Sequence, residues 1–292
     1  MEPDLAFAVW TSERQQRIEH VLDRSLARID GGPPALIEAM RYAVLGGGKR
    51  VRPLLAYAAG ELADADPAIV DAPAAAVEMI HAYSLVHDDL PCMDDDVLRR
   101  GKPTCHIAFG EAMALLAGDA LQAQAFAVLH SARLPDPRST CLMLAEAAGA
   151  SGMAGGQAID LLHVGKAMSM ADLEDMHLRK TGALIRAAIR MGAACGSPVD
   201  EDALDRYARA TGLAFQVVDD VLDVEGSSAT LGKTAGKDAA QNKPTYVTLL
   251  GLAEAKRHAE SLREEARDAL GVFGPRARRL LEITDWIVRR KA

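Results

Sequence analysis

The feature that most constrains this chain is an apolar helical segment that ends in a cluster of aspartates. Residues 77–90 read VEMIHAYSLVHDDL, and Pro91 ends this helix because proline cannot continue it and disfavours helical backbone in the residue before it. Asp88 and Asp89 are therefore expected in the last turn, with Asp94 just beyond. A helix C-terminus already carries partial negative charge, so carboxylates there cost about 0.3–1 kcal/mol each. Clustered oxygen ligands at such a place favour a hard cation, and Mg²⁺ is the expected one.

The same pattern occurs a second time, over residues 211–226. This segment reads TGLAFQVVDDVLDVEG, an apolar helix that is expected to end at Gly226 as its C-cap. An acidic stripe on an otherwise buried helix must face a wet cavity or a cation, because an unpaired buried charge is too costly. Two such helices predict one site between them. The stripe is made of residues spaced i, i+3, i+4 and i+7 on one helix face: Gln216, Asp219, Asp220 and Asp223.

Length and composition predict a single all-α domain over residues 1–292. No linker divides the 292 residues, of which 49% are hydrophobic and only 4% aromatic, so the core is expected to be aliphatic. No segment alternates polar and apolar residues as a strand would. Helical spacing instead runs through long segments between breaks, such as 104–133, 138–163 and 171–194. The expected fold is a bundle of about ten or more helices.

Charge and composition exclude some partners. The formal net charge of −8 argues against a nucleic-acid-binding surface. The start, MEPDLAFAVW, lacks the basic region and long apolar run of a signal peptide, and no membrane-spanning segment is expected. The cysteines show no Cys-x-x-Cys spacing, which suits a cytoplasmic location; they are Cys92, Cys105, Cys141 and Cys195.

Basic residues accompany the aspartates along the chain. Each cluster has an ordinary explanation by itself: the glycine run 46–48 can cap a helix, and paired arginines can form a salt-bridge patch. Together, carboxylates, Mg²⁺ and Lys/Arg side chains are the groups that bind a diphosphate. No serine or cysteine has an obvious activating partner, so diphosphate is expected to be the leaving group or the handle of an apolar substrate. The basic residues are Lys49, Arg50, Arg52, Arg99, Arg100, Lys180, Lys233, Lys237 and Lys243.

Taken together, these motifs resemble the bacterial trans-isoprenyl diphosphate synthases. The resemblance implies the isoprenoid synthase fold, an all-α domain around a central apolar cavity, and usually a homodimer. It also implies a Mg²⁺-dependent condensation of isopentenyl diphosphate with dimethylallyl or geranyl diphosphate. The matching motifs run through nearly the whole chain: GGGKRVRP, Asp88-Asp89-x-x-x-x-Asp94, RRGKPTCH, GGQAID, RKTGALI, FQVVDDVLD and TLGKTAGKD.

The resemblance also assigns a role to individual side chains. The leaving diphosphate would be neutralised by three Mg²⁺ ions and by basic residues, and side-chain and backbone oxygens would face the allylic cation. The expected sets are Asp88, Asp94 and Asp219 as metal ligands; Asp89, Asp220 and Asp223 as their support; Arg99, Lys180, Lys233 and Lys243 on the allylic diphosphate; Lys49, Arg52, His81 and Arg100 on isopentenyl diphosphate; and Lys180, Thr181 and Gln216 beside the cation.

The product length is expected to depend on side chains one turn before the metal site. Tyr83 and Ser84 lie five and four residues before Asp88. In the family, a bulky aromatic residue there forms a floor that stops chain growth, so Tyr83 favours the C15 product, farnesyl diphosphate, over geranylgeranyl or geranyl diphosphate. Met113 is a further floor candidate. Pro244, directly after Lys243, departs from the family pattern and leaves the reach of that lysine open.

Three other interpretations compete with this one. Glu78-x-x-His81 and Glu174-x-x-His177 have the spacing of di-iron carboxylate bundles, which would make the protein an oxidoreductase. That interpretation leaves the doubled aspartates and the lysines unexplained, and the iron content of the purified protein would test it. A non-catalytic prenyl-diphosphate-binding subunit is expected to lack part of an aspartate motif, and a terpene cyclase would not need the second basic set.

Overall fold

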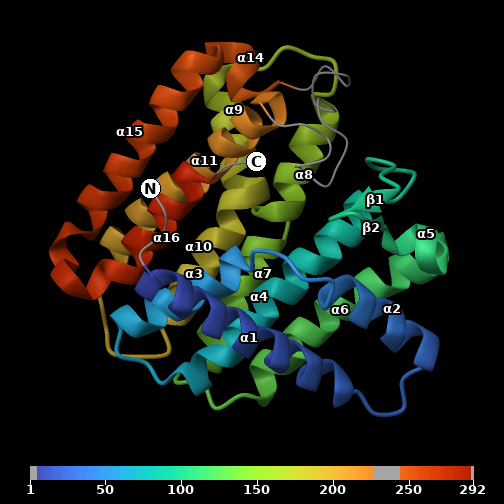
Figure 1. Ribbon diagram of the computed structural model, residues 1–292. Coiled ribbons are helices and arrows are strands. Elements are labelled where there is room, and N and C mark those ends of the chain that lie inside the picture. The colour runs from blue at the N-terminus through green and yellow to red at the C-terminus, as the bar shows by residue number, and fades with distance from the viewer. Residues whose placement is uncertain (1–4, 226–243, 291–292) are drawn as a thin grey trace.

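The computed structural model describes residues 5–225 and 244–290, and almost all of this part is helical. The prediction of an all-α fold is confirmed. The described elements, labelled in Figure 1, are α1 (Leu5–Ala27), α2 (Pro34–Val44), α3 (Val51–Leu62), α4 (Pro67–Asp88), β1 (Leu98–Arg99), β2 (Lys102–Pro103), α5 (Cys105–Phe109), α6 (Glu111–Ser131), α7 (Pro137–Ala148), α8 (Met153–Leu162), α9 (Met170–His177), η1 (Leu178–Gly182), α10 (Ala183–Ala193), α11 (Glu201–Glu225), α14 (Tyr246–Leu250), α15 (Leu252–Leu270), η2 (Gly271–Ala277) and α16 (Arg278–Arg289).

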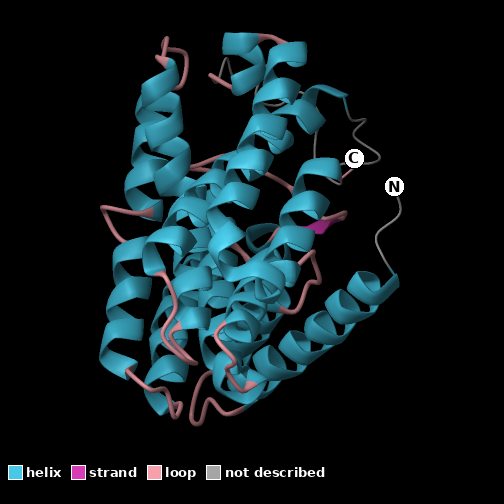
Figure 2. Ribbon diagram, turned by 90° about the vertical axis from the view of Figure 1, so that its left-hand side faces the viewer, coloured by secondary structure: helices cyan, strands magenta, loops and turns pink. Residues whose placement is uncertain are grey.

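Two long helices, α4 and α11, carry the two aspartate clusters, and the rest of the bundle surrounds them. Helix α4 packs against α3 and α6, helix α11 packs against α15, and α10 contacts both α4 and α11. Figure 2 shows α1 lying on the outside of this arrangement. Most core positions carry small aliphatic side chains, as the composition predicted, so neighbouring helices can approach closely.

Helix α4 ends where its sequence predicts, and a side-chain cap marks its start. The Asp66 side chain accepts a hydrogen bond from the backbone N–H of Ala68 and caps the helix, and Pro67 occupies the first helical position. The last helical residue is Asp88, and Asp89 is the C-cap. The predicted position of the first aspartate pair is therefore confirmed. The second predicted stop, Gly226, lies outside the described residues.

The predicted single helix over residues 104–133 is wrong. One helix ends at Phe109 and the next begins at Glu111. Gly110 between them adopts φ 86° and ψ 155°, a conformation that is open to glycine and strained for other residues. The predicted helix 138–163 is likewise two helices, α7 and α8, separated by the turn at residues 149–152.

Two further features were not predicted. A two-residue antiparallel hairpin pairs β1 with β2, and its turn residues Arg100 and Gly101 both have positive φ, which matches the right-handed twist of paired strands. Residues 171–194 do form one helical run, but residues 178–182 inside it make a π-turn. Such turns accommodate one extra residue and are frequent at functional sites.

Candidate active site

The first aspartate cluster is folded back onto the end of α4. The backbone N–H of Asp94 donates to the carbonyl of Asp88 at 2.8 Å, and the N–H of Asp95 donates to the carbonyl of Leu90 at 3.2 Å. Burial raises the pKa of Asp88 to about 6; the Asp94 and Asp89 carboxylates add to this rise, while Lys180 and Arg99 oppose it. The loop therefore concentrates negative charge at the point that the sequence predicts for metal ligands.

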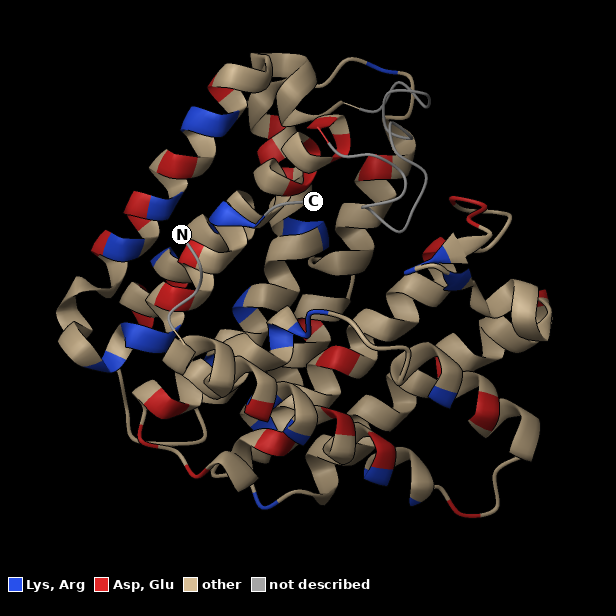
Figure 3. Ribbon diagram, in the orientation of Figure 1, with Lys and Arg blue, Asp and Glu red and all other residues tan. Residues whose placement is uncertain are grey.

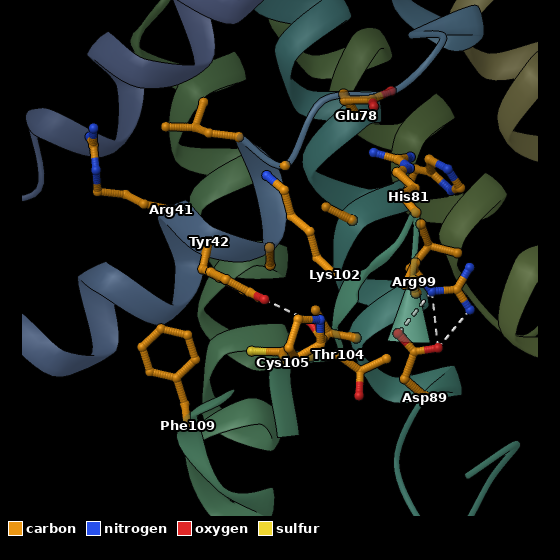
Figure 4. A pocket seen from close by; sticks show the side chains of 18 of the residues that line it. Arg41, Tyr42, Glu78, His81, Asp89, Arg99, Lys102, Thr104, Cys105 and Phe109 are labelled. Carbon is orange, nitrogen blue, oxygen red and sulfur yellow. Dashed lines mark hydrogen bonds and ion pairs between the residues drawn. The ribbon is translucent and has the colours of Figure 1, made fainter. Parts of the chain in front are cut away.

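Arg99 lies against this cluster and is held by Asp89. The guanidinium Nε and Nη2 donate to the Asp89 carboxylate at 2.8 and 2.6 Å, a two-pronged contact that Figure 4 shows from close by. Asp89 itself is 2% exposed, whereas the Arg99 side chain is 32% exposed. Asp89 therefore orients Arg99 and leaves part of its guanidinium accessible.

Lys180 reaches the same place from the π-turn. Its Nζ lies 2.6 Å from Asp160 of α8, and its charge is the strongest opposing influence on the pKa of Asp88. Helix α8 can approach because residue 156 is glycine: a Cβ there would lie 2.2 Å from the backbone nitrogen of Lys180. In the sequence, Asp160 stands out only as the last residue of the GGQAID motif, and no part in holding Lys180 is predicted for it.

The polar stripe of α11 continues this site through a chain of hydrogen bonds. Thr181 Oγ1 donates to Gln216 Oε1 at 3.3 Å, and Gln216 Nε2 donates to Asp220 Oδ1 at 3.1 Å. The second oxygen of Asp220 accepts from the backbone N–H of Tyr246 at 2.8 Å. Both carboxylate oxygens of Asp220 thus bind protein groups, while Asp223 is buried on the same helix face.

Asp219 contacts a residue that the sequence analysis did not single out. It forms an ion pair with Arg290, which also donates to the Phe215 carbonyl at 3.1 Å and lies 4.2 Å from the centre of the Phe215 ring. The Arg290 side chain is only 6% exposed. No local signal marks Arg290, because the contact joins the C-terminal end of the chain to the middle of α11.

The four residues expected to bind isopentenyl diphosphate line one cavity of about 690 Å³. Burial lowers the pKa of His81 well below its usual value and also lowers that of Arg52, and nearby arginines act in the same direction. Arg52 Nε is buried and has no hydrogen-bond partner among the described residues. A surplus of buried positive charge favours an anionic ligand. The polar lining consists of Lys49, Arg50, Arg52, His81 and Arg100, together with Glu78, Asp219 and Arg290.

A neighbouring cavity of about 350 Å³ lies between α2, α4 and the hairpin (Figure 4). Tyr42 of α2 donates to the Pro103 carbonyl at 2.6 Å across its rim. His81 and Arg100 line both cavities, so these residues stand at the boundary between them. In the orientation that Figure 1 and Figure 3 share, the acidic loop beside β1 and the C-terminal end of α11 both lie in the upper half of the view.

The candidate floor residues lie below the first cluster on α4. Tyr83 is 8% exposed and packs edge-on against the His87 ring at 5.6 Å, and Ser84 Oγ donates to the His81 carbonyl at 2.9 Å. Met113 of α6 is partly buried against the core. Lys233 and Lys243, which are expected to bind the allylic diphosphate, lie outside the described residues. The structure therefore does not test whether Pro244 alters the reach of Lys243.

The acidic residues fit Mg²⁺ better than a di-iron centre. Within residues 5–225 and 244–290, no three His, Cys, Asp or Glu side chains are arranged to hold a metal by themselves, as a di-iron site requires. Mg²⁺ instead takes one or two carboxylates and completes its octahedron with water and phosphate oxygens. The proposed iron ligand Glu78 is bound by Arg50 at 2.6 Å, and His177 stacks on Tyr246 at 5.4 Å.

An all-α bundle with two acidic helix ends beside a basic cavity fits the class of proteins that bind diphosphates together with divalent cations. Comparison with known sequences is more specific: the chain belongs to the polyprenyl synthetase family, whose profile it matches over residues 33–270.

Individual relatives are similar over nearly the whole chain. The probable farnesyl diphosphate synthase of Bradyrhizobium diazoefficiens is 50% identical over 283 residues, which cover 94% of this chain and 85% of that protein. The farnesyl diphosphate synthase of Escherichia coli is 48% identical over 286 residues, or 94% of this chain and 96% of the relative.

Solved structures agree with this assignment. The geranyltransferase of Legionella pneumophila superposes with a TM-score of 0.88 at 38% identity, covering 98% of this chain and 97% of that one. The geranyltransferase of Helicobacter pylori, solved with magnesium and isoprenyl diphosphate, gives a TM-score of 0.84 at 32% identity and covers 98% of both chains.

Proposed function

We propose that this protein is a Mg²⁺-dependent trans-prenyltransferase. It condenses isopentenyl diphosphate with dimethylallyl and then geranyl diphosphate, and releases farnesyl diphosphate and diphosphate. The observation that carries the proposal is the cavity with surplus buried positive charge, including the unpartnered Arg52 Nε, beside the acidic end of α4. The relatives in Escherichia coli and Bradyrhizobium diazoefficiens support the same reaction.

The acidic helix ends hold the metal in this proposal. Asp88, Asp94 and Asp219 would bind three Mg²⁺ ions, and the magnesium in the structure of the Helicobacter pylori relative supports the choice of metal. Bound there, Mg²⁺ supplies Lewis-acid neutralisation of the leaving diphosphate. Asp89 and Asp220 keep neighbouring groups in place through their contacts with Arg99, Gln216 and Tyr246.

The remaining steps belong to the chain's own side chains. Arg99 and Lys180, each oriented by a carboxylate, bind the allylic diphosphate and stabilise the charge that develops on it as the C–O bond breaks. Thr181 and Gln216 present oxygens to the resulting allylic cation. The double bond of isopentenyl diphosphate, held in the basic cavity, attacks this cation, and the released diphosphate accepts the final proton.

The chain-length part of the proposal depends on Tyr83. Its largely buried ring on α4, one turn before Asp88, is supporting geometry for a floor that stops growth at C15. Geranylgeranyl and geranyl diphosphate are the alternative products, and relatives named for geranylgeranyl synthesis are also similar, for example at 45% identity in Capsicum annuum.

We also propose that the protein forms a homodimer through the outer face of α6 and its neighbours. Exposed apolar side chains gather there: Leu115 and Leu116 of α6 are 47% and 51% exposed, and Ile107 of α5 is 52% exposed. Helices α5 and α6 are in contact, and exposed apolar side chains on neighbouring helices are typical of a subunit interface. Leu116→Glu is expected to shift the mass measured by light scattering from dimer to monomer, and an unchanged mass would contradict this interface.

Membrane insertion is not part of the proposal. By length and apolar composition, α4 and α6 could each cross a membrane, but 67% of the α4 window is buried inside the fold, as in the core helix of a soluble protein. For α6 the buried share is 33%, and the homodimer would cover its exposed face. The cysteines of the described residues are free thiols, which is consistent with the cytoplasmic location that we propose.

The test is the chain length of the product. The purified protein is incubated with Mg²⁺, isopentenyl diphosphate and dimethylallyl diphosphate, and the dephosphorylated products are separated by chromatography. A C15 product that lengthens in Tyr83→Ala supports both the reaction and the floor. A C20 product from the unaltered chain keeps the reaction and rejects the floor, and no product with Mg²⁺ present rejects the reaction.

A further inference from the structure

Arg50 is buried at the joint between the glycine loop and α3, yet it is not among the residues proposed to touch substrate. Its side chain is 2% exposed and ties three helices together. Nε donates to Glu19 of α1 at 2.7 Å and Nη1 donates to Glu78 of α4 at 2.6 Å. Nη2 donates to the carbonyl of Val44, the last residue of α2, at 2.6 Å. All three guanidinium nitrogens therefore bind protein groups.

The backbone of Arg50 is held in a conformation that a residue with a Cβ rarely adopts. Its φ of 51° and ψ of 38° lie in the left-handed region. Such a conformation persists only where the surroundings over-determine it, and it concentrates at functional sites. Arg50 is also the N-cap of α3, and its carbonyl accepts the first helical hydrogen bond, from Leu54 N–H at 3.0 Å. The side-chain contacts therefore fix both the turn and the start of the helix.

The residues on either side of this joint line the basic cavity. Lys49 precedes Arg50 and Arg52 follows it by two, and both belong to the proposed isopentenyl diphosphate subsite. The N-terminus of α3 adds its own partial positive charge next to them. A shift of the Arg50 backbone would move both cations and the helix end together.

Arg50 also balances a carboxylate inside this cavity. Glu78 lines the cavity, is 2% exposed, and has one oxygen without a hydrogen-bond partner in the described part of the chain. Left alone, that charge would repel a diphosphate. The ion pair with Arg50 removes this repulsion; Arg50 also lines the cavity, but its three guanidinium nitrogens already donate to protein groups.

We propose that Arg50 is a positioning residue for the isopentenyl diphosphate subsite, fixing Lys49, Arg52 and the start of α3 through its contacts with Glu19, Glu78 and Val44. The proposal rests on the proposed function for the identity of the ligand, but its geometry concerns any diphosphate in this cavity.

Two variants separate positioning from folding. Arg50→Lys keeps the charge opposite Glu78 but cannot make the three-way contact. The double variant Arg50→Met with Glu78→Leu removes both buried charges and leaves the net charge of the cavity unchanged; Glu19, which also loses its partner, is 36% exposed and can be hydrated. Arg263→Lys is the matched control, because Arg263 is a buried arginine bound by Glu260 and Asp285 on the far helices α15 and α16.

The first measurement is calorimetric binding of inorganic diphosphate in EDTA, which reports the basic cavity without metal. Both Arg50 variants are expected to weaken binding roughly ten- to a hundredfold, as small misplacements of positioning groups do, while Arg263→Lys binds as the parent does. Steady-state assays should show a matching rise in KM for isopentenyl diphosphate with little change in KM for geranyl diphosphate.

The outcomes are separable. If both Arg50 variants fold and bind diphosphate as the parent does, or if both KM values rise equally, the proposal is overturned. It is also overturned if the parent binds no diphosphate in EDTA. If the parent binds diphosphate in an Arg50-dependent way but makes no prenyl product, the positioning role is supported and the proposed function fails.

Discussion

The two acidic helix ends share one sequence pattern, but the folded protein uses them differently. At the end of α4, the Asp88 carboxylate accepts no hydrogen bond from the described residues and has a pKa raised to about 6. On α11, Asp219 is paired with Arg290, and both oxygens of Asp220 bind protein groups. Beside Asp88, Asp89 is paired with Arg99, so the first end differs from the second in its Asp88 carboxylate. The comparison teaches that one sequence pattern can be held differently at two places in a fold, because the contacts of each carboxylate are set by residues distant in sequence.

The largest expected effect comes from removing the Asp88 carboxylate. Asp88→Asn should lower kcat/KM at least about a thousandfold, because a metal ligand supplies several kcal/mol of charge stabilisation. The same change should raise the melting temperature of the protein in EDTA, because a buried carboxylate beside Asp89 and Asp94 is removed. A loss of activity together with a lower melting temperature would contradict the interpretation that the Asp88 carboxylate destabilises the metal-free protein.

The second prediction concerns the pH dependence of stability. It depends on His177, which stacks on Tyr246, the residue whose N–H binds Asp220 of α11. Burial lowers the pKa of His177 to about 3, with Lys180 acting in the same direction and Asp160 against it. The unfolded chain therefore binds more protons than the native state between pH 6.5 and about 3, and the free energy of unfolding should fall as the pH falls through this window.

Each pKa unit corresponds to about 1.4 kcal/mol, so about 2 kcal/mol should be lost between pH 6.5 and pH 5. Urea unfolding of the parent and of His177→Phe at pH 7 and pH 5 measures it. The phenylalanine can keep the stacking on Tyr246 without a titrating group, so its stability should depend less on pH. Equal pH dependence in both proteins would reject His177 as the source.

The third prediction tests whether Asp220 organises the site without receiving the metal. Asp220→Ala leaves the Tyr246 N–H without its acceptor and should destabilise the fold by about 1–3 kcal/mol. It should also lower kcat roughly a hundredfold through misplaced Gln216 and Thr181, with a smaller effect on the Mg²⁺ concentration needed for half-maximal rate. If the Mg²⁺ requirement changes as strongly as it does in Asp94→Asn, the two ends are alike and the comparison fails.

The smallest expected effect concerns the internal counter-ion of α11. Arg290→Gln frees Asp219 from its ion pair, so Mg²⁺ in the presence of inorganic diphosphate should bind more tightly, by up to about tenfold for a pair in which only the arginine is buried. Thermal shift against Mg²⁺ concentration measures this without turnover. Arg289→Gln, on the same terminal turn, is the control and should leave the Mg²⁺ dependence unchanged. Weaker Mg²⁺ binding in Arg290→Gln alone would mean that Arg290 assists the metal site.

Much of this arrangement could be predicted because its signals are local. Pro91 placed the end of α4, and the spacing of Gln216 and Asp220 placed both on one helix face, where they form a hydrogen bond. The break at Gly110 was missed because a glycine inside a helical pattern can also be accommodated by the helix. Arg290 and Asp160 were missed because their partners are distant in sequence and are chosen by packing, which spacing does not encode.

The π-turn at residues 178–182 has a consequence for the rotational phase of the helix that contains it. One extra residue in a turn displaces every later side chain by about 100° around the helix axis relative to an unbroken α-helix. Helices α9 and α10 therefore face their neighbours in different phases, and Lys180 lies at the changeover. Deleting a single residue within this turn would let an ordinary α-helix run through, rotating the packed face of α10 away from α3 and α4 or carrying Lys180 away from Asp160. Loops tolerate the insertion or deletion of a residue, whereas within this turn either change would rotate the following helix about its axis.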